Sequence, residues 1–436
     1  MSDPEDAIDR VSLGIILWTA ILLFAYSAMG VEWFVPGDFE WREAMSYHGV
    51  VISAWMLLNL GILRHAVQLR WFAKIGAPLC MGALAASLLS GLSGFFIRTP
   101  GMSVGSFIQF AGMFLGDLVG IATLILTLLM LRQKPKKTKP LVLISLAVCL
   151  AGIVLSTPLG HLAGAIRDWG GQAAFLTMHA RMIGKEPAEA IDFYVGSHSH
   201  QMVSAFIGCA MLIPFLKRKD EVKGFAVLGA VAIFLATASS LAQIGLYQYS
   251  AWTGWEPPDL FKSGPNGMPL DDLILSVLGF SLLLLVPSLL VRQYTINGGP
   301  PADTSRNRVL AFVYLSYLMT MVGLGIYIEF HEELFGGADP SSGAPWVHCD
   351  LAFIRAHLIY GCMLVPLIMS LLVNLHGPGR VGECALAAVA CVGMVGVFVW
   401  TFYLQPFPLQ VSVYLAALSL LIIAGFGWKS QRHGEA

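Results

Sequence analysis

The residues of this sequence that are best suited to chemistry are histidines, and the densest group is Gly196-Ser-His198-Ser-His200-Gln-Met202. Histidine is the commonest metal ligand in proteins and also binds haem iron. Helical residues two positions apart differ by ~200° in direction. His198 and His200 would therefore point to opposite sides of one helix and serve two different centres. The alternative is a pair of polar side chains that meet lipid headgroups where a helix begins.

A second candidate ligand is His48, in the segment Arg42-Glu-Ala-Met-Ser-Tyr47-His48-Gly49. The apolar run that follows predicts a helix, with His48 about one turn inside it. Gly49 removes a side chain where a flat macrocycle would need to approach the backbone closely. This combination favours haem, although a lone histidine near a helix end also occurs for structural reasons.

The third candidate segment is Asp350-Leu-Ala-Phe-Ile-Arg355-Ala-His357. His357 is a candidate haem or metal ligand on the helix that begins here. Arg355 is a candidate partner for a haem propionate, because a guanidinium binds a carboxylate through two parallel hydrogen bonds. The alternative for Arg355 is a side chain that extends to the membrane interface.

Acidic residues accompany a further histidine in Tyr327-Ile-Glu329-Phe-His331-Glu332-Glu333. Carboxylate and imidazole suit iron, manganese or zinc, and the same groups can relay protons. Glu329, His331 and Glu333 are therefore the candidate catalytic residues, with His331 also a metal ligand. His161 is a further candidate ligand. The alternative is an acidic helix end in contact with water.

Long apolar segments position all of these residues. The chain has 436 residues, of which 56% are hydrophobic and 12% charged, and its mean hydropathy is +0.72. These values predict an all-α, multi-pass membrane protein. About twelve segments approach the ~20 residues that a spanning helix needs. They are 12–31, 46–63, 76–97, 105–131, 140–163, 196–216, 224–246, 272–291, 309–328, 351–373, 383–404 and 409–428.

Basic residues occupy alternate connections between these segments, as in Arg132-Gln-Lys-Pro-Lys-Lys-Thr-Lys139 and Lys217-Arg-Lys219. Short basic loops stay in the cytoplasm, so both termini are predicted to be cytoplasmic. The candidate histidines then lie toward the outer side. We expect a single membrane domain, 1–436, with outer caps at 164–195, 247–271 and 329–350. No basic surface interleaved with aromatic residues indicates nucleic acid as a partner.

Three of the histidine-bearing segments are the second, sixth and tenth of the set, and here the chain resembles the catalytic subunits of haem-copper oxidases and nitric oxide reductases. That superfamily has twelve helices with both ends inside. Met45-Ser-Tyr-His48, followed by Trp55, resembles the reductase helix with a low-spin haem ligand. Gly196-Ser-His198-Ser-His200 resembles the HxH helix of the family, which is the tenth there and the sixth here. The consecutive His-His pair of the family does not occur in this sequence.

The resemblance implies that His48 and His200 hold one b-type haem. It implies that His198 serves a second haem, with His357 or an open position opposite. Bis-imidazole ligation suits electron transfer and an open position suits catalysis. A non-haem iron or copper is a further candidate cofactor. The implied partners are the lipid bilayer and, on the outer side, quinol or a redox subunit such as a cytochrome c.

We therefore predict a haem-binding oxidoreductase of a prokaryotic inner membrane that transfers electrons near the outer face and reduces a small gas such as nitric oxide or oxygen. A non-catalytic haem anchor that passes electrons from quinol is one alternative. A transition-metal transporter is the other, because outward-facing histidines and carboxylates can also bind a metal ion in transit.

Overall fold

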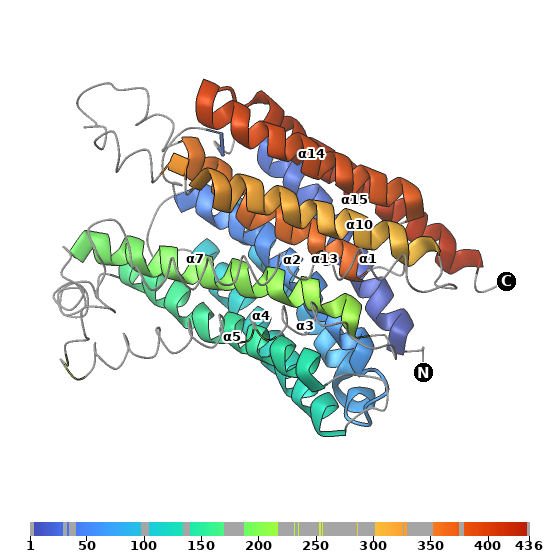
Figure 1. Cartoon of the computed structure of the whole chain (residues 1–436). Coiled ribbons are helices and arrows are strands. Elements are labelled where there is room, and N and C mark those ends of the chain that lie inside the picture. Colours follow the sequence, from blue (N-terminus) through green and yellow to red (C-terminus); the bar gives the residue numbers. More distant parts are fainter. Residues whose placement is uncertain are drawn as a thin grey trace. The chain divides into compact units, whose positions relative to one another are not determined.

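The computed structural model describes residues 4–28, 33–34, 41–96, 104–133, 140–169, 187–216, 301–325, 327–328, 352–374 and 379–433, with a few single residues between 231 and 286. Within these residues the chain is helical and contains no strand (Figure 1). The expectation of an all-α protein is confirmed for this part of the chain.

The described helices follow the apolar segments of the sequence. The α-helices are α1 (Pro4–Ala28), α2 (Trp41–Ala66), α3 (Phe72–Phe96), α4 (Val104–Gln133), α5 (Pro140–Trp169), α7 (Pro187–Leu212), α10 (Pro301–Tyr317), α13 (Val365–Asn374), α14 (Gly379–Tyr403) and α15 (Phe407–His433). A short 3-10 turn, η1 (Ile213–Phe215), ends α7. Two π-helices, η3 (Leu318–Gly323) and η5 (His357–Leu364), continue α10 and precede α13.

Among the described residues, eight helices are long and apolar enough to cross a membrane: Glu5–Ala28, Ser46–Ala66, Phe72–Phe96, Val104–Gln133, Pro140–Pro158, Ala352–Asn374, Arg380–Tyr403 and Phe407–Phe426. A shorter apolar helix covers Met202–Phe215. The chain is thus a multi-pass helical membrane protein, and each of these helices overlaps a predicted span. The predicted spans 224–246 and 272–291 lie outside the described helices.

The chain divides into two compact units. Unit 1 comprises Met1–Thr99, Val104–Val119 and Leu289–Ala436, and unit 2 comprises Pro100–Ser103 and Gly120–Ser288. Helix α4 runs from one unit into the other. His48, Arg355 and His357 belong to unit 1, whereas His161, His198 and His200 belong to unit 2.

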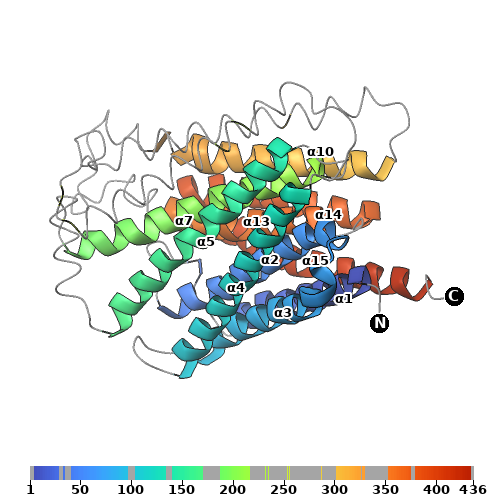
Figure 2. The same cartoon turned by 90° about the horizontal axis from the view of Figure 1, so that it is seen from below.

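Helix α1 of unit 1 runs antiparallel to α2 and to α13. Asp9 near the start of α1 forms an ion pair with Arg64 near the end of α2, and Ser12 of α1 contacts Asn374 at the end of α13. Helices α14 and α15 form a close antiparallel pair, because a Cβ at Gly396 would lie 2.7 Å from the main chain of Leu409. The start of α1 and the end of α15 therefore lie at the same end of unit 1 (Figures 1 and 2).

That end of unit 1 is basic. Arg64 lies there close to Arg306, Arg70 follows in the short turn between α2 and α3, and Lys74 lies in the first turn of α3. Elsewhere on the unit, large apolar side chains face outward, among them Phe107, Phe114, Tyr403, Phe407 and Leu418. Outward apolar surfaces of this kind suit contact with the lipid bilayer.

Candidate functional site

Two parallel helices form the most enclosed part of unit 1. One is α2, and the other runs from Ala352 through η5 to Asn374. Their first turns meet where Glu43 contacts Arg355, and their last turns meet where a Cβ at Gly61 would lie 3.4 Å from Asn374 Cα. Figures 1 and 2 show α2 and α13 side by side in the middle of the unit. Both helices carry a candidate histidine.

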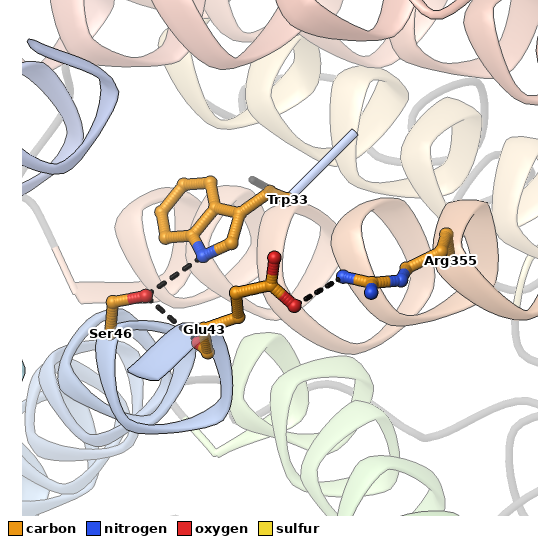
Figure 3. A network of polar contacts seen from close by, with 4 residues as sticks. All are labelled: Trp33, Glu43, Ser46 and Arg355. Atoms are coloured by element: carbon orange, nitrogen blue, oxygen red, sulfur yellow. Dashed lines mark hydrogen bonds and ion pairs between the residues drawn. The ribbon is translucent and has the colours of Figure 1, made fainter. Parts of the chain in front are cut away.

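A buried ion pair joins the first turns of these two helices (Figure 3). Arg355 Nη1 donates a hydrogen bond of 2.8 Å to Glu43 Oε2, and the side chains are 3% and 6% exposed. Removing one partner of such a pair leaves an uncompensated buried charge and typically costs ~3–5 kcal/mol. The pair is therefore a fixed contact between segments that lie 312 positions apart in the sequence.

Ser46 and Trp33 extend this network (Figure 3). The Ser46 hydroxyl donates to the main-chain oxygen of Glu43 at 2.8 Å, and Trp33 Nε1 donates to Ser46 Oγ at 2.8 Å. Trp33 is only 2% exposed. The indole thus covers the first turn of α2 and completes the hydrogen bonding of Ser46.

His48 lies on α2 five residues after Glu43, half-buried, with its ring edge-on to that of Tyr47 at 5.5 Å. Tyr47 in turn contacts Cys362 of η5. Gly49 has a different role from the one expected. Because residue 49 has no side chain, α3 packs directly against α2 at this position. A Cβ at residue 49 would lie 2.9 Å from Gly91 Cα. The space beside Gly49 is filled by a neighbouring helix, which would leave no room there for a macrocycle.

His357 is half-buried, begins the π-helix η5, and lies edge-on to Phe353 at 5.7 Å. Arg355, two residues earlier, is only 3% exposed, which differs from the alternative of a side chain that extends outward to an interface. Its guanidinium is bound to a carboxylate of the protein itself, Glu43. A haem propionate is thus not needed to neutralise it.

Two π-helices pack against each other beside His357. A Cβ at Gly361 of η5 would lie 2.3 Å from the sulfur of Met321 in η3. The hydroxyl of Tyr360 donates to the Ala390 carbonyl of α14 at 2.8 Å and lies 2.7 Å from Ser316 Oγ of α10. Short π-helical turns within α-helices are frequent at functional sites. Through Tyr360, the π-helix η5 connects the helix Ala352–Asn374 to α14 and α10.

In unit 2, α5 and α7 pack as an antiparallel pair around His198. His198 Nδ1 lies 2.7 Å from the main-chain oxygen of Ser156. A carbonyl oxygen only accepts hydrogen bonds, so Nδ1 carries a proton, and in the neutral imidazole Nε2 keeps its lone pair. Metal-binding histidines are commonly oriented in this way, with the second ring nitrogen donating to a main-chain carbonyl.

The local sequence of α5 explains how the ring is accommodated. A Cβ at Gly160 would lie 2.6 Å from His198 Nε2, so only glycine leaves space for the ring. Pro158 lacks the N–H that would bond to the Val154 carbonyl. The Thr157 hydroxyl donates to that carbonyl instead, at 2.9 Å. A proline and a glycine thus shape the surface of α5 on which His198 lies.

The remaining candidates divide between described and undescribed residues. His161 follows Gly160 on α5 and is half-buried. His200 belongs to α7, but its side chain lies outside the described residues, as do Glu329, His331 and Glu333. In the part of the chain that the structure describes, no group of three or more His, Cys, Asp or Glu side chains gathers closely enough to hold a metal ion.

Sequence reasoning did not single out Glu43, Trp33 or Ser46 as site residues. Glu43 had one usable signal, since it is a carboxylate in the first turn of a helix that becomes strongly apolar after residue 48. The acceptor for His198 left no such signal, because it is a main-chain oxygen.

The helices and their apolar surfaces define the class of this chain as a multi-pass helical membrane protein. Comparisons with protein-family models, with curated proteins and with solved structures give no match. The functional assignment therefore depends on the site residues themselves.

Proposed function

We propose that this chain is a haem-binding membrane oxidoreductase that transfers electrons near the outer face of a prokaryotic inner membrane. The observation that carries the proposal is the orientation of His198. Its Nδ1–H donates to the Ser156 carbonyl, and in the neutral imidazole Nε2 is then the nitrogen that carries the lone pair a ligand needs. The ring packs against α5 at Gly160, where a side chain would collide with it. An imidazole held in this tautomer has the chemistry that an axial haem ligand requires.

His48 and His357 support the same proposal from unit 1. They lie on the two most enclosed helices of that unit, each within two turns of the Glu43–Arg355 pair. Enclosure by neighbouring helices keeps water away, and the low dielectric constant that results is a main determinant of haem potential. A bound haem would supply redox-active iron, which with one axial position open binds a small gas such as nitric oxide or oxygen.

The proposed topology places the basic end of unit 1 in the cytoplasm, following the distribution of Arg and Lys. His48 and His357 then lie toward the outer face, where quinol or a redox subunit such as a cytochrome c would exchange electrons. His200, Glu329, His331 and Glu333 remain proposed ligands or proton carriers on the strength of the sequence.

The test is a reduced-minus-oxidised visible spectrum of the purified chain, with a pyridine haemochrome assay and carbon monoxide added to the reduced form. One or two b-type haems are expected, and a spectral shift with carbon monoxide indicates an open position and gas reduction. Haem that does not respond to carbon monoxide indicates an electron relay. A preparation without haem refutes the proposal and favours transition-metal transport.

Single variants identify the ligands. His48→Ala, His198→Ala and His357→Ala are expected to lower the haem content or to convert a low-spin spectrum to a high-spin one. His65→Ala is the matched control, because His65 lies in the last turn of α2, at the basic end. If His65→Ala changes the spectrum as much as the other three variants do, these assignments are wrong.

A further inference from the structure

The Glu43–Arg355 pair stands where the two enclosed helices of unit 1 begin. Both side chains are almost completely buried, and the Ser46 hydroxyl and Trp33 indole close over the first turn of α2 (Figure 3). Ionisable groups inside a membrane protein are costly and usually functional. We therefore expect this pair, at the first turns of two histidine-bearing helices, to have a function.

The two helices are held in register at both ends, with unequal numbers of residues between the contacts. The contacts are 18 residues apart along α2, from Glu43 to Gly61, and 19 residues apart along its neighbour, from Arg355 to Asn374. The π-helix η5 accommodates this difference, because its hydrogen bonds join residues five apart instead of four. The ion pair is thus the contact that fixes where η5, and with it His357, begins relative to His48.

We propose that Glu43 and Arg355 are positioning residues for the histidines, acting in two ways. As a contact, the pair fixes the depth of His357 relative to that of His48. As two opposite charges in a poorly screened interior, it sets the electrostatic potential around both histidines. The second part rests on the proposed haem function, whereas the first part does not.

The two parts predict different responses to substitution. Either substitution removes the ion pair, so Glu43→Gln and Arg355→Gln both lower the thermal midpoint of unfolding. The electrostatic effects have opposite signs. Glu43→Gln removes a negative charge, which disfavours ferric haem and raises its reduction potential. Arg355→Gln removes a positive charge, which favours ferric haem and lowers the potential.

The experiment measures thermal midpoints and haem potentials of the full chain in detergent for both single variants and for the charge-swapped double variant Glu43→Arg/Arg355→Glu. Arg380→Gln is the matched control, because Arg380 is exposed at the start of α14. We expect the double variant to recover most of the midpoint that each single variant loses. We also expect the two Gln variants to shift the potential in opposite directions while Arg380→Gln leaves it unchanged.

Three results bear against the inference. A double variant as unstable as the single variants overturns the role of the pair as a contact between the helices. Potentials that shift in the same direction in both Gln variants overturn the electrostatic role, since a merely structural defect would act in that way. A wild-type chain without haem refutes the proposed function and the electrostatic role together, and the midpoints then decide the contact role alone.

Discussion

Replacing Gly160 by alanine tests whether His198 is held against α5 as the structure indicates. The added Cβ would lie 2.6 Å from Nε2 and 2.7 Å from Cε1 of the imidazole. These contacts are closer than real Cβ atoms make. The ring has little freedom to retreat while its Nδ1–H remains bonded to the Ser156 carbonyl.

The expected magnitude combines three terms. Alanine stabilises a helix relative to glycine by roughly 0.5–1 kcal/mol. Overpacking a close contact costs ~1–3 kcal/mol, and losing the bond from His198 to Ser156 costs ~0.5–1.5 kcal/mol. The balance is a destabilisation of about 2 kcal/mol. Under the proposed function, the haem bound through His198 is also lost or weakened.

The assay is thermal unfolding in detergent followed by circular dichroism, together with the pyridine haemochrome content. Gly425→Ala is the matched control, because a Cβ at that position of α15 meets nothing within 4 Å. The double variant Gly160→Ala/His198→Ala separates the terms, since alanine at 198 removes the clash. If Gly160→Ala is as stable as Gly425→Ala, or is equally destabilising when His198 is absent, the packing argument is refuted.

Two further substitutions test the helix contacts of unit 1. Gly393→Ala brings a Cβ to 2.3 Å from the ring of Tyr360, and the two hydrogen bonds of the Tyr360 hydroxyl keep the ring from moving away. We therefore expect thermal unfolding to show a destabilisation of ~1–3 kcal/mol. The additional substitution Tyr360→Leu should relieve this destabilisation. Trp33→Phe removes the 2.8 Å hydrogen bond to Ser46, so it should lower the free energy of unfolding by ~0.5–1.5 kcal/mol. The loss should be smaller in a Ser46→Ala background, where that hydrogen bond is already absent. Equal losses in both backgrounds would contradict the assigned contact.

The helices were predictable because their signal is local. A segment of about twenty apolar residues must satisfy its own backbone hydrogen bonds in a bilayer, and the helix is the structure that does so within one segment. The predicted spans 46–63 and 351–373, for instance, differ from Ser46–Ala66 and Ala352–Asn374 by three residues or fewer. The importance of the candidate histidines as ligands remains a prediction.

The partners of the site residues were not predictable in the same way. The sequence did not predict that Gly49 lies where α3 packs against α2, or that Arg355 binds Glu43. Which residues of two helices meet depends on how each helix is rotated about its axis and shifted along it. Small residues such as Gly49 and Gly61, together with the extra residue wound into η5, decide those rotations and shifts.

By itself, the sequence determined that this chain forms apolar helices able to cross a membrane, and it showed which of them carry histidines, because helix formation and hydropathy are properties of one continuous segment. Only the tertiary structure decided that Glu43 pairs with Arg355 and that the Ser156 carbonyl orients His198. Both contacts join distant segments, and they form only because close helix packing excludes other partners from a buried, poorly solvated interior.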